Sequence, residues 1–226
     1  MEVLGNIPVE FSSEEVLKKL HLDPRLTKRL EAEDLVKTAT AIIDPKALYT
    51  TGYVTNREGD TTEIEGIRLA SRVLARNLEK VERVFPYIIT IGRALEDEAS
   101  ARSSILQKLF LESTGDLAVT SARAYLERHL AKRYALGGVS HMGPGQLDWP
   151  VAQQKQLFSF FEDVEAKVGV SLTESFMMIP RKSISGIIFP TEVTFTSCQL
   201  CPRENCGSRQ TAYSESLRRS YGLGPE

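Results

Sequence analysis

The chain has little cysteine, little histidine and no strong excess of charge among its 226 residues. Three cysteines cannot form the dense disulfide network that stabilises small secreted domains. The 28 basic and 30 acidic residues leave a formal net charge of −2, which argues against nucleic acid as the main partner. No apolar run is long enough to span a bilayer, and the acidic start MEVLGNIPVEFSSEEV is not typical of a signal peptide. We therefore expect a cytoplasmic protein that binds neither membranes nor nucleic acid.

The composition that remains is ordinary for a globular protein, with 42% apolar and 26% charged residues. Neither a repeat nor a low-complexity tract interrupts the chain, so we predict one domain over residues 1–226. Its N-terminal part, residues 1–45, is expected to be helical, because Ser12 and Glu15 form a capping-box pattern. Residues 197–226 are expected to form a cysteine loop followed by a C-terminal helix.

Hydrophobic periodicity and turn residues predict alternating helices and short strands. The expected helices cover about 13–20, 24–43, 70–80, 95–113, 116–136, 150–168 and 208–221. The expected strands cover 7–11, 47–56, 61–69, 84–92, 171–179, 183–189 and 192–197. Since most strands are short and hairpin-like, the pattern indicates an α+β fold with an antiparallel or mixed twisted sheet flanked by helices.

The motifs of the common hydrolases and nucleotide-binding proteins are missing. The sequence contains no P-loop, no H-E-x-x-H and no nucleophile elbow, and its G-P-G-Q turn does not fit the G-x-G-x-x-G fingerprint. His21 at a helix end and His129 on the long helix are expected at the surface. His141, in the polar glycine-rich loop 139–150, is the one histidine that we consider a functional candidate.

Two stretches within residues 139–189 resemble the activation region of cobalamin-dependent methionine synthase. The first is GPGQLDWPVAQQKQLFSFF (143–161) and the second is VSLTESFMMIPRKSISGIIFP (170–190). The second stretch fits the family pattern L-T-E-S-x-x-M-x-P-x-x-S-x-S-G nearly position by position. The resemblance implies a methionine synthase activation-domain-like fold, here as a stand-alone protein, because 226 residues leave no room for the other modules of the enzyme.

The resemblance also implies a function. In the family this region binds S-adenosylmethionine and docks on the cobalamin domain when the cobalt has become inactive cob(II)alamin. One electron from a flavodoxin-type donor and a methyl group from S-adenosylmethionine then restore methylcobalamin. The implied cofactor-binding residues are those of the glycine turn, His141, Gly143, Pro144, Gly145 and Gln146, with Glu174 and Ser175 near the cobalamin face or groove edge.

The chain departs from the family at the S-adenosylmethionine motif. The family's Arg-x-x-x-Gly-Tyr falls on residues 141–146, where Gly145 is kept, the arginine is His141 and the tyrosine is Gln146. An arginine can pair bidentately with a carboxylate, whereas a histidine offers at most one charged donor. Glutamine also lacks the aromatic face of tyrosine. An adaptor that no longer binds S-adenosylmethionine is therefore the alternative function.

All three cysteines lie within the nine residues CQLCPRENC, as Cys198, Cys201 and Cys206. Their C-x2-C-x4-C spacing could supply three thiolates to an iron–sulfur cluster or to zinc, with a fourth ligand from His141, a carboxylate, water, substrate or a second chain. A redox thiol pair and the absence of any metal remain alternatives. A cluster would suit a protein that passes one electron to cobalt.

Two further groups of side chains surround these motifs. Arg203, Arg209, Arg218 and Arg219 are expected on a solvated helix face, with a docking patch for an acidic partner as the alternative. Trp149, Phe158, Phe160 and Phe161 are expected to pack in the core or against a cobalamin domain rather than to stack on a cofactor.

We therefore predict a protein that assists reductive reactivation or methylation of a separate corrinoid protein or truncated methionine synthase, with a flavodoxin- or ferredoxin-type donor. A non-catalytic corrinoid-protein adaptor is the second reading. A metal-dependent methyltransferase acting on a thiol is the third. Whether the chain is itself an enzyme is left open.

Overall fold

A computed structural model of the chain describes residues 1–207 and 209–224. Its centre is an antiparallel sheet built around strand β6 (Arg83–Thr90), whose apolar side chains are almost all buried. One edge of β6 pairs with β10 (Ser183–Pro190), and β10 pairs in turn with β7 (Val139–Met142). The other edge pairs with β2 (Lys46–Tyr49) and, further along, with β3. The predicted α+β class, and the central place of the strand within 84–92, are confirmed.

The remaining strands extend the sheet beyond β2 at one edge and beyond β3 at the other. β1 (Glu2–Leu4) pairs with β2 at one edge. β3 (Gly52–Glu58), β4 (Thr61–Ile64) and β5 (Ile67–Ala70) form a meander at the other, and this confirms the predicted hairpin around residues 57–60. The short strands β8 (Ser171–Leu172) and β9 (Met178–Ile179) form a separate two-stranded ribbon.

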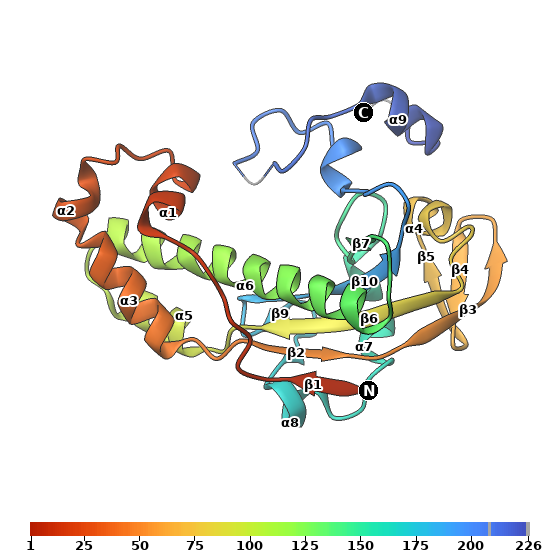
Figure 1. Ribbon diagram of the computed structural model, residues 1–226, viewed down its shortest axis with the longest axis horizontal. Coiled ribbons are helices and arrows are strands. Elements are labelled where there is room, and N and C mark those ends of the chain that lie inside the picture. The colour runs from red at the N-terminus through yellow and green to blue at the C-terminus, as the bar shows by residue number, and fades with distance from the viewer. Residues whose placement is uncertain (208, 225–226) are drawn as a thin grey trace.

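Helix α6 (Ile105–Arg133) lies across one face of the sheet, as Figure 1 shows. Four helices of the N-terminal half pack around one end of α6, and together they bury one large apolar cluster between the N-terminal part and the sheet. These helices are α1 (Ser13–Lys19), α2 (Leu26–Leu30), α3 (Ala32–Ile42) and α5 (Ala94–Ala101). The capping box that opens α1 is confirmed, because the Ser12 and Glu15 side chains each accept from the other's backbone N–H.

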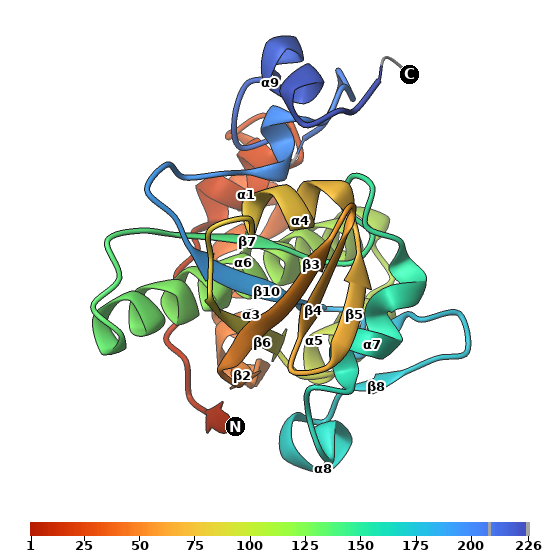
Figure 2. The same ribbon diagram turned by 90° about the vertical axis from the view of Figure 1, so that its right-hand side faces the viewer.

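A second apolar cluster joins the β3–β5 meander to the C-terminal part of the chain. It contains the fully buried Trp149 together with Phe195, Leu200 and residues of α4 (Arg72–Asn77). α7 (Gln154–Phe158) and α9 (Glu215–Ser220) belong to this region, whereas α8 (Val164–Val168) covers β2 and β6 in a third cluster. Figure 2 shows α8 and α9 at opposite ends of the molecule. Trp149 and Phe161 are buried and Phe158 and Phe160 half-buried, as predicted for core aromatics.

Several predicted elements are wrong or shorter than expected. Residues 7–11 form no strand, since Pro8 has no N–H and only Ile7 donates to the β2 side, at Pro45. Residues 192–197 form no strand either, because the Phe195 N–H donates to the Ser140 hydroxyl instead of to a neighbouring strand. The loop predicted over 139–150 begins with β7. The strand predicted over 171–179 is only the short ribbon β8–β9, with a turn between its strands.

The expected long helices over 24–43 and 150–168 are each interrupted by a residue in left-handed conformation. Glu31 has φ +55° and separates α2 from α3. Asp163 has φ +51° and precedes α8, after a 3-10 turn (Val151–Gln153) and α7. By contrast, α6 is longer than predicted, because Ser104 caps it and the helix runs through Gly115 without a break. Among the residues described, no helix is both long and apolar enough to cross a membrane.

Candidate functional site

The glycine turn, residues 143–146, follows β7 at a point where the backbones of β7 and β10 approach closely. A Cβ added at Gly143 would lie 2.4 Å from the Ser185 carbonyl oxygen, and one added at Gly186 would lie 2.4 Å from the Met142 carbonyl oxygen. Both distances are shorter than any real Cβ contact, so only glycine permits this approach. The Tyr87 hydroxyl lies beside this contact, 3.1 Å from the Cβ position of Gly186. Burial raises the pKa of the Tyr87 phenol above its ordinary value.

Hydrogen bonds within the turn occupy its own N–H groups. The Gly145 N–H donates to the Trp149 carbonyl at 2.8 Å, and Gly145 adopts φ +87°. The Gln146 N–H donates to the Gly143 carbonyl at 3.2 Å, and the Gln146 side-chain oxygen accepts from the Gly143 N–H at 3.3 Å. Pro144 has no N–H. The turn is therefore closed on itself, and Gln146 takes part in closing it.

Two side chains that no sequence motif indicated fix this turn to the rest of the molecule. The Asp148 carboxylate accepts from the Ser71 hydroxyl at 2.6 Å and from the Arg72 N–H at 2.7 Å, at the start of α4. The Gln153 side chain bonds both backbone groups of Ala70, at 2.8 and 2.9 Å, and so extends the free edge of β5. Nothing in the local pattern LDWPVAQ specified these partners, which lie more than 70 residues upstream.

His141 faces helix α6 rather than the glycine turn. Its Nδ1 lies 2.8 Å from Glu127 Oε1, and Arg123 Nε lies 3.4 Å from the same oxygen. The three side chains are only 15–23% exposed. The contacts are poorly directed, because neither Arg123 Nε nor Glu127 Oε1 makes a well-aligned hydrogen bond. The residue at the position of the family's arginine is thus engaged by a carboxylate of this chain.

Glu174 and Ser175 lie on a separate exposed turn between β8 and β9. The Thr173 N–H donates to the Met177 carbonyl at 2.9 Å, and the Thr173 and Ser175 hydroxyls lie 3.0 Å apart. Met177, on the same turn, is 54% exposed. The turn therefore presents polar atoms and one apolar side chain to the solvent.

An ion cluster holds the chain just after this ribbon against α6. The Lys182 ammonium lies 2.9 Å from Glu112 and 2.7 Å from Asp116, and Arg181 also contacts Glu112 at 2.9 Å. Burial alone would raise the pKa of the Glu112 carboxyl, but hydrogen bonds and charges from Lys182 and Arg181 outweigh it and hold that pKa below its ordinary value. For Lys182 the same contacts outweigh burial and raise the pKa of the ammonium.

The cysteine loop is organised around an arginine. The Arg209 guanidinium donates to the carbonyls of Cys198 at 3.1 Å and Cys201 at 3.2 Å, and also to that of Arg203. Arg218 is 9% exposed and donates to the Leu200 carbonyl at 2.7 Å. The prediction of a solvated arginine face is therefore wrong for these two residues, whose side chains support the loop from inside.

The three thiols are free and half-buried on this loop. Cys198 lies in a 3-10 turn (Ser197–Gln199), and its sulfur accepts from the Gln210 N–H at 3.5 Å. Within residues 1–207 and 209–224, no three side chains of His, Cys, Asp and Glu stand together as metal ligands. The structure therefore gives the predicted metal site no direct support, and it remains a prediction.

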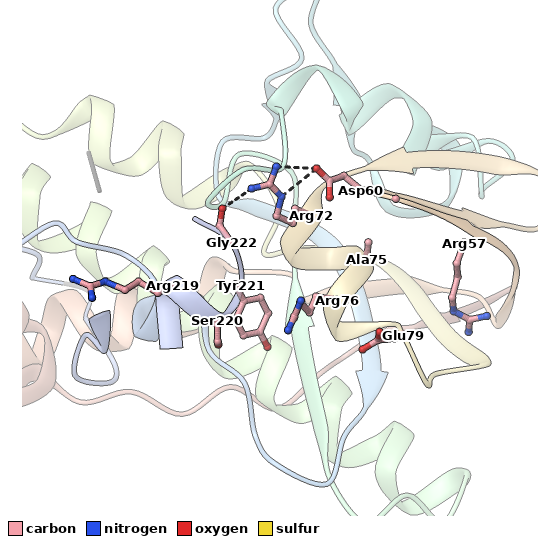
Figure 3. A pocket seen from close by; sticks show the side chains of 11 residues that line it. Arg57, Asp60, Arg72, Ala75, Arg76, Glu79, Arg219, Ser220, Tyr221 and Gly222 are labelled. Carbon is pink, nitrogen blue, oxygen red and sulfur yellow. Dashed lines mark hydrogen bonds and ion pairs between the residues drawn. The ribbon is translucent and has the colours of Figure 1, made fainter. Parts of the chain in front are cut away.

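Two hollows flank α4 and the C-terminal helix. A cavity of about 460 Å³ is lined by four arginines, Arg57, Arg72, Arg76 and Arg219, together with acidic and tyrosine side chains. Figure 3 shows that Arg72 is bound to Asp60 and to the Gly222 carbonyl, so it fastens the C-terminal segment to α4. An open groove of about 1310 Å³ lies at the other end of β10 from the glycine turn, between Pro190, Tyr53 and Arg83.

His129 is not the surface residue that the sequence predicted. Its ring is half-buried and its Nε2 lies 3.2 Å from the buried Tyr49 hydroxyl. His21 is exposed, as predicted.

Residues 131–206 match the family model described as vitamin B12 dependent methionine synthase, activation domain. The match covers about a third of the chain and takes in the glycine turn, both quoted stretches and all three cysteines. A search of curated proteins returns no match.

The fold is similar to that in the crystal structure of the MetH reactivation domain bound to AdoHcy. The TM-score is 0.56 at 18% sequence identity, and the alignment covers 88% of this chain and 82% of that one. The similarity thus extends well upstream of residue 131.

Proposed function

We propose that the chain assists reactivation of a corrinoid protein or truncated methionine synthase, because residues 131–206 match the family model of the vitamin B12 dependent methionine synthase activation domain. In this reaction one electron from a flavodoxin- or ferredoxin-type donor and a methyl cation from S-adenosylmethionine convert cob(II)alamin to methylcobalamin and leave S-adenosylhomocysteine. The protein's own part is docking and positioning, since the cofactor carries the chemistry.

The observation that carries this proposal is the close approach of β7 and β10 at Gly143 and Gly186, inside the segment that matches the family. The resemblance puts the nucleoside ligand at the turn 143–146 beside this close approach, where Gly145 is exposed. The solved relative of the same fold is bound to AdoHcy, which supports S-adenosylmethionine or its demethylated product as the ligand class. Glu174 and Ser175, exposed on the β8–β9 turn, are proposed to contact the corrinoid partner.

One observation favours the adaptor as a second candidate. The N–H groups of Gly143, Gly145 and Gln146 are all engaged inside the turn, and His141 is engaged by Glu127. A ligand would have to displace Gln146 to reach the Gly143 N–H. An adaptor would bind the corrinoid protein through this face without S-adenosylmethionine.

Ligand titration separates the two candidates. We would titrate S-adenosylmethionine and S-adenosylhomocysteine calorimetrically into wild type and into Gln146→Tyr. The variant should bind about tenfold more tightly, because an aromatic face is added and the Gly143 N–H is freed. Gln156→Tyr, at an exposed position on α7, is the matched control and should bind as wild type.

Saturable binding of S-adenosylmethionine to wild type, with reduction and methylation of cob(II)alamin on an added corrinoid protein when a flavodoxin- or ferredoxin-type electron donor is supplied, supports the activator. Binding of the corrinoid protein by wild type without either nucleoside supports the adaptor. If wild type binds neither the nucleosides nor the corrinoid protein, both candidate functions are contradicted.

A further inference from the structure

The cysteine loop lies against the C-terminal end of helix α1, although the two segments stand at opposite ends of the sequence (Figures 1 and 2). A Cβ added at Gly207, the residue after Cys206, would lie 3.8 Å from His21 Nε2 and 3.8 Å from the Lys19 carbonyl oxygen. The fold therefore brings an imidazole nitrogen to the segment that carries all three thiols.

The way α1 ends directs His21 toward the loop. The Leu22 N–H donates to the Leu17 carbonyl at 2.9 Å and the His21 N–H to that of Lys18 at 3.1 Å, which is the hydrogen-bond pattern of a Schellman motif. His21 occupies the left-handed position of this motif with φ +54°, where glycine or asparagine is usual. Its exposed ring makes no hydrogen bond or ion pair with the part of the chain that the structure describes. The histidine thus stands in a strained conformation with its ring uncommitted.

The thiol side has features expected around metal-bound thiolates. The Gln210 N–H donates to Cys198 Sγ at 3.5 Å, an N–H···S contact that would remain possible with the sulfur bound to a metal. Arg209 holds the carbonyls of Cys198 and Cys201, and the Cys201 N–H donates back to the Cys198 carbonyl at 3.4 Å. These bonds keep the C-x2-C pair on one tight turn.

We propose that His21 is the fourth ligand of a tetrahedral metal centre whose other ligands are Cys198, Cys201 and Cys206. The inference rests on the metal-binding role that the sequence predicts for the cysteines, and it adds the ligand that C-x2-C-x4-C spacing leaves open. Three thiolates and one imidazole are the donor set of structural Cys3His sites. Binding would release the thiol protons to solvent and join the C-terminal loop to the N-terminal helices.

Formation of the centre requires the loop to close, because its ligands do not yet converge in the described geometry. Residues 202–207 form no helix or strand, so this segment can move without breaking a regular element. Such coupling of closure to binding is usual, since metal sites are rarely preformed without the metal.

The test is a titration of the full chain, reduced and free of metal, with Co²⁺ followed by Zn²⁺ competition. Wild type should bind one Co²⁺ with thiolate-to-metal charge-transfer bands and the intense visible bands of a tetrahedral ion. His21→Asn keeps a residue that tolerates the left-handed conformation but removes the ring nitrogen. It should weaken Zn²⁺ binding by more than the 10- to 100-fold typical for loss of a supporting partner of a ligand, and shift the visible bands.

Cys201→Ser should lose the charge-transfer intensity in proportion to the missing thiolate. His129→Asn, at the histidine that contacts Tyr49, is the matched control and should bind metal as wild type. Iron and sulfide analysis of protein purified without oxygen then shows whether the native occupant is a single ion or a cluster.

Stoichiometric binding by wild type that is unchanged in His21→Asn would overturn the assignment of the fourth ligand. Absence of stoichiometric Co²⁺, Zn²⁺ or iron in wild type would overturn the centre as a whole. Neither result depends on nucleoside or corrinoid binding, so failure of this proposal is distinguishable from failure of the proposed function.

Discussion

Gly143 and Gly186 allow the backbones of β7 and β10 to approach closely because neither residue has a Cβ atom. Each Cβ position is 2.4 Å from a carbonyl oxygen of the neighbouring strand, so a side chain there must push the two backbones apart. The separation of β7 and β10 at the candidate site therefore depends on these two residues.

Gly186→Ala should lower the free energy of unfolding by about 2–3 kcal/mol, because the added methyl group overlaps backbone that cannot move independently. Chemical denaturation measures this change. Gly137→Ala is the matched control, since no atom lies within 4 Å of its Cβ position, and it should be neutral or stabilise by up to about 1 kcal/mol. Equal stability of the two variants would show that the close approach is not real.

His141 shows why a motif alone does not give the direction in which a side chain points. Sequence spacing aligned it with the family's arginine and suggested a side chain directed at the ligand. Strand alternation in β7 sends it instead to the α6 face, where Glu127 receives it, while Ser140 and Met142 point to the other face.

At the scale of the elements, ion pairs between side chains, rather than apolar contacts, hold the segment between β9 and β10 against α6. Lys182 is 14% exposed and is shared by Glu112 and Asp116. Since the pKa of Glu112 is lowered in the folded protein, its contribution is present above the carboxyl's unfolded pKa and is lost as the pH falls through the folded value.

Glu112→Gln should therefore lower the free energy of unfolding by about 1–3 kcal/mol at pH 7 and by much less at pH 3. Denaturant unfolding at the two pH values measures the difference. Asp97→Asn, in an exposed i,i+4 pair with Arg93, is the control and should change stability by less than about 0.5 kcal/mol at either pH. A loss for Glu112→Gln that is the same at both pH values would contradict this assignment.

At the scale of the whole molecule, the C-terminal segment packs into the second apolar cluster. Leu200 and Phe195 are buried with Trp149 and with α4, while Arg72 and Arg218 bind backbone carbonyls of the last residues described. The prediction of a single domain over residues 1–226 can therefore be tested by asking whether this segment unfolds together with the rest of the chain.

Leu200→Ala should destabilise the whole domain by about 2–4 kcal/mol, because it removes a fully buried side chain. Trp149 is the only tryptophan and is 1% exposed, so its fluorescence reports on this cluster, whereas far-UV circular dichroism is dominated by helices such as α6. Both signals should shift together in thermal unfolding. Separate transitions would show that the C-terminal cluster unfolds on its own and that the chain is not one cooperative unit.

The sequence by itself determined the features that depend on neighbours along the chain. The capping box at Ser12, the buried strand β6 and the part of α6 from residue 116 onward follow from local hydrogen bonding and from hydrophobic periodicity. The order of residues in 170–190 was sufficient to indicate the resemblance to the activation region, and the family model matches residues 131–206, which include this stretch.

Only the tertiary structure decided which distant groups meet. Asp148 reaches Ser71, Glu127 meets His141, Arg209 collects the carbonyls of the cysteine loop, and His21 stands beside Gly207. Even the left-handed residues Glu31 and Asp163 split helices that local propensity would have continued. These contacts depend on how buried faces pack, and a polar side chain takes whatever partner that packing brings within hydrogen-bond distance.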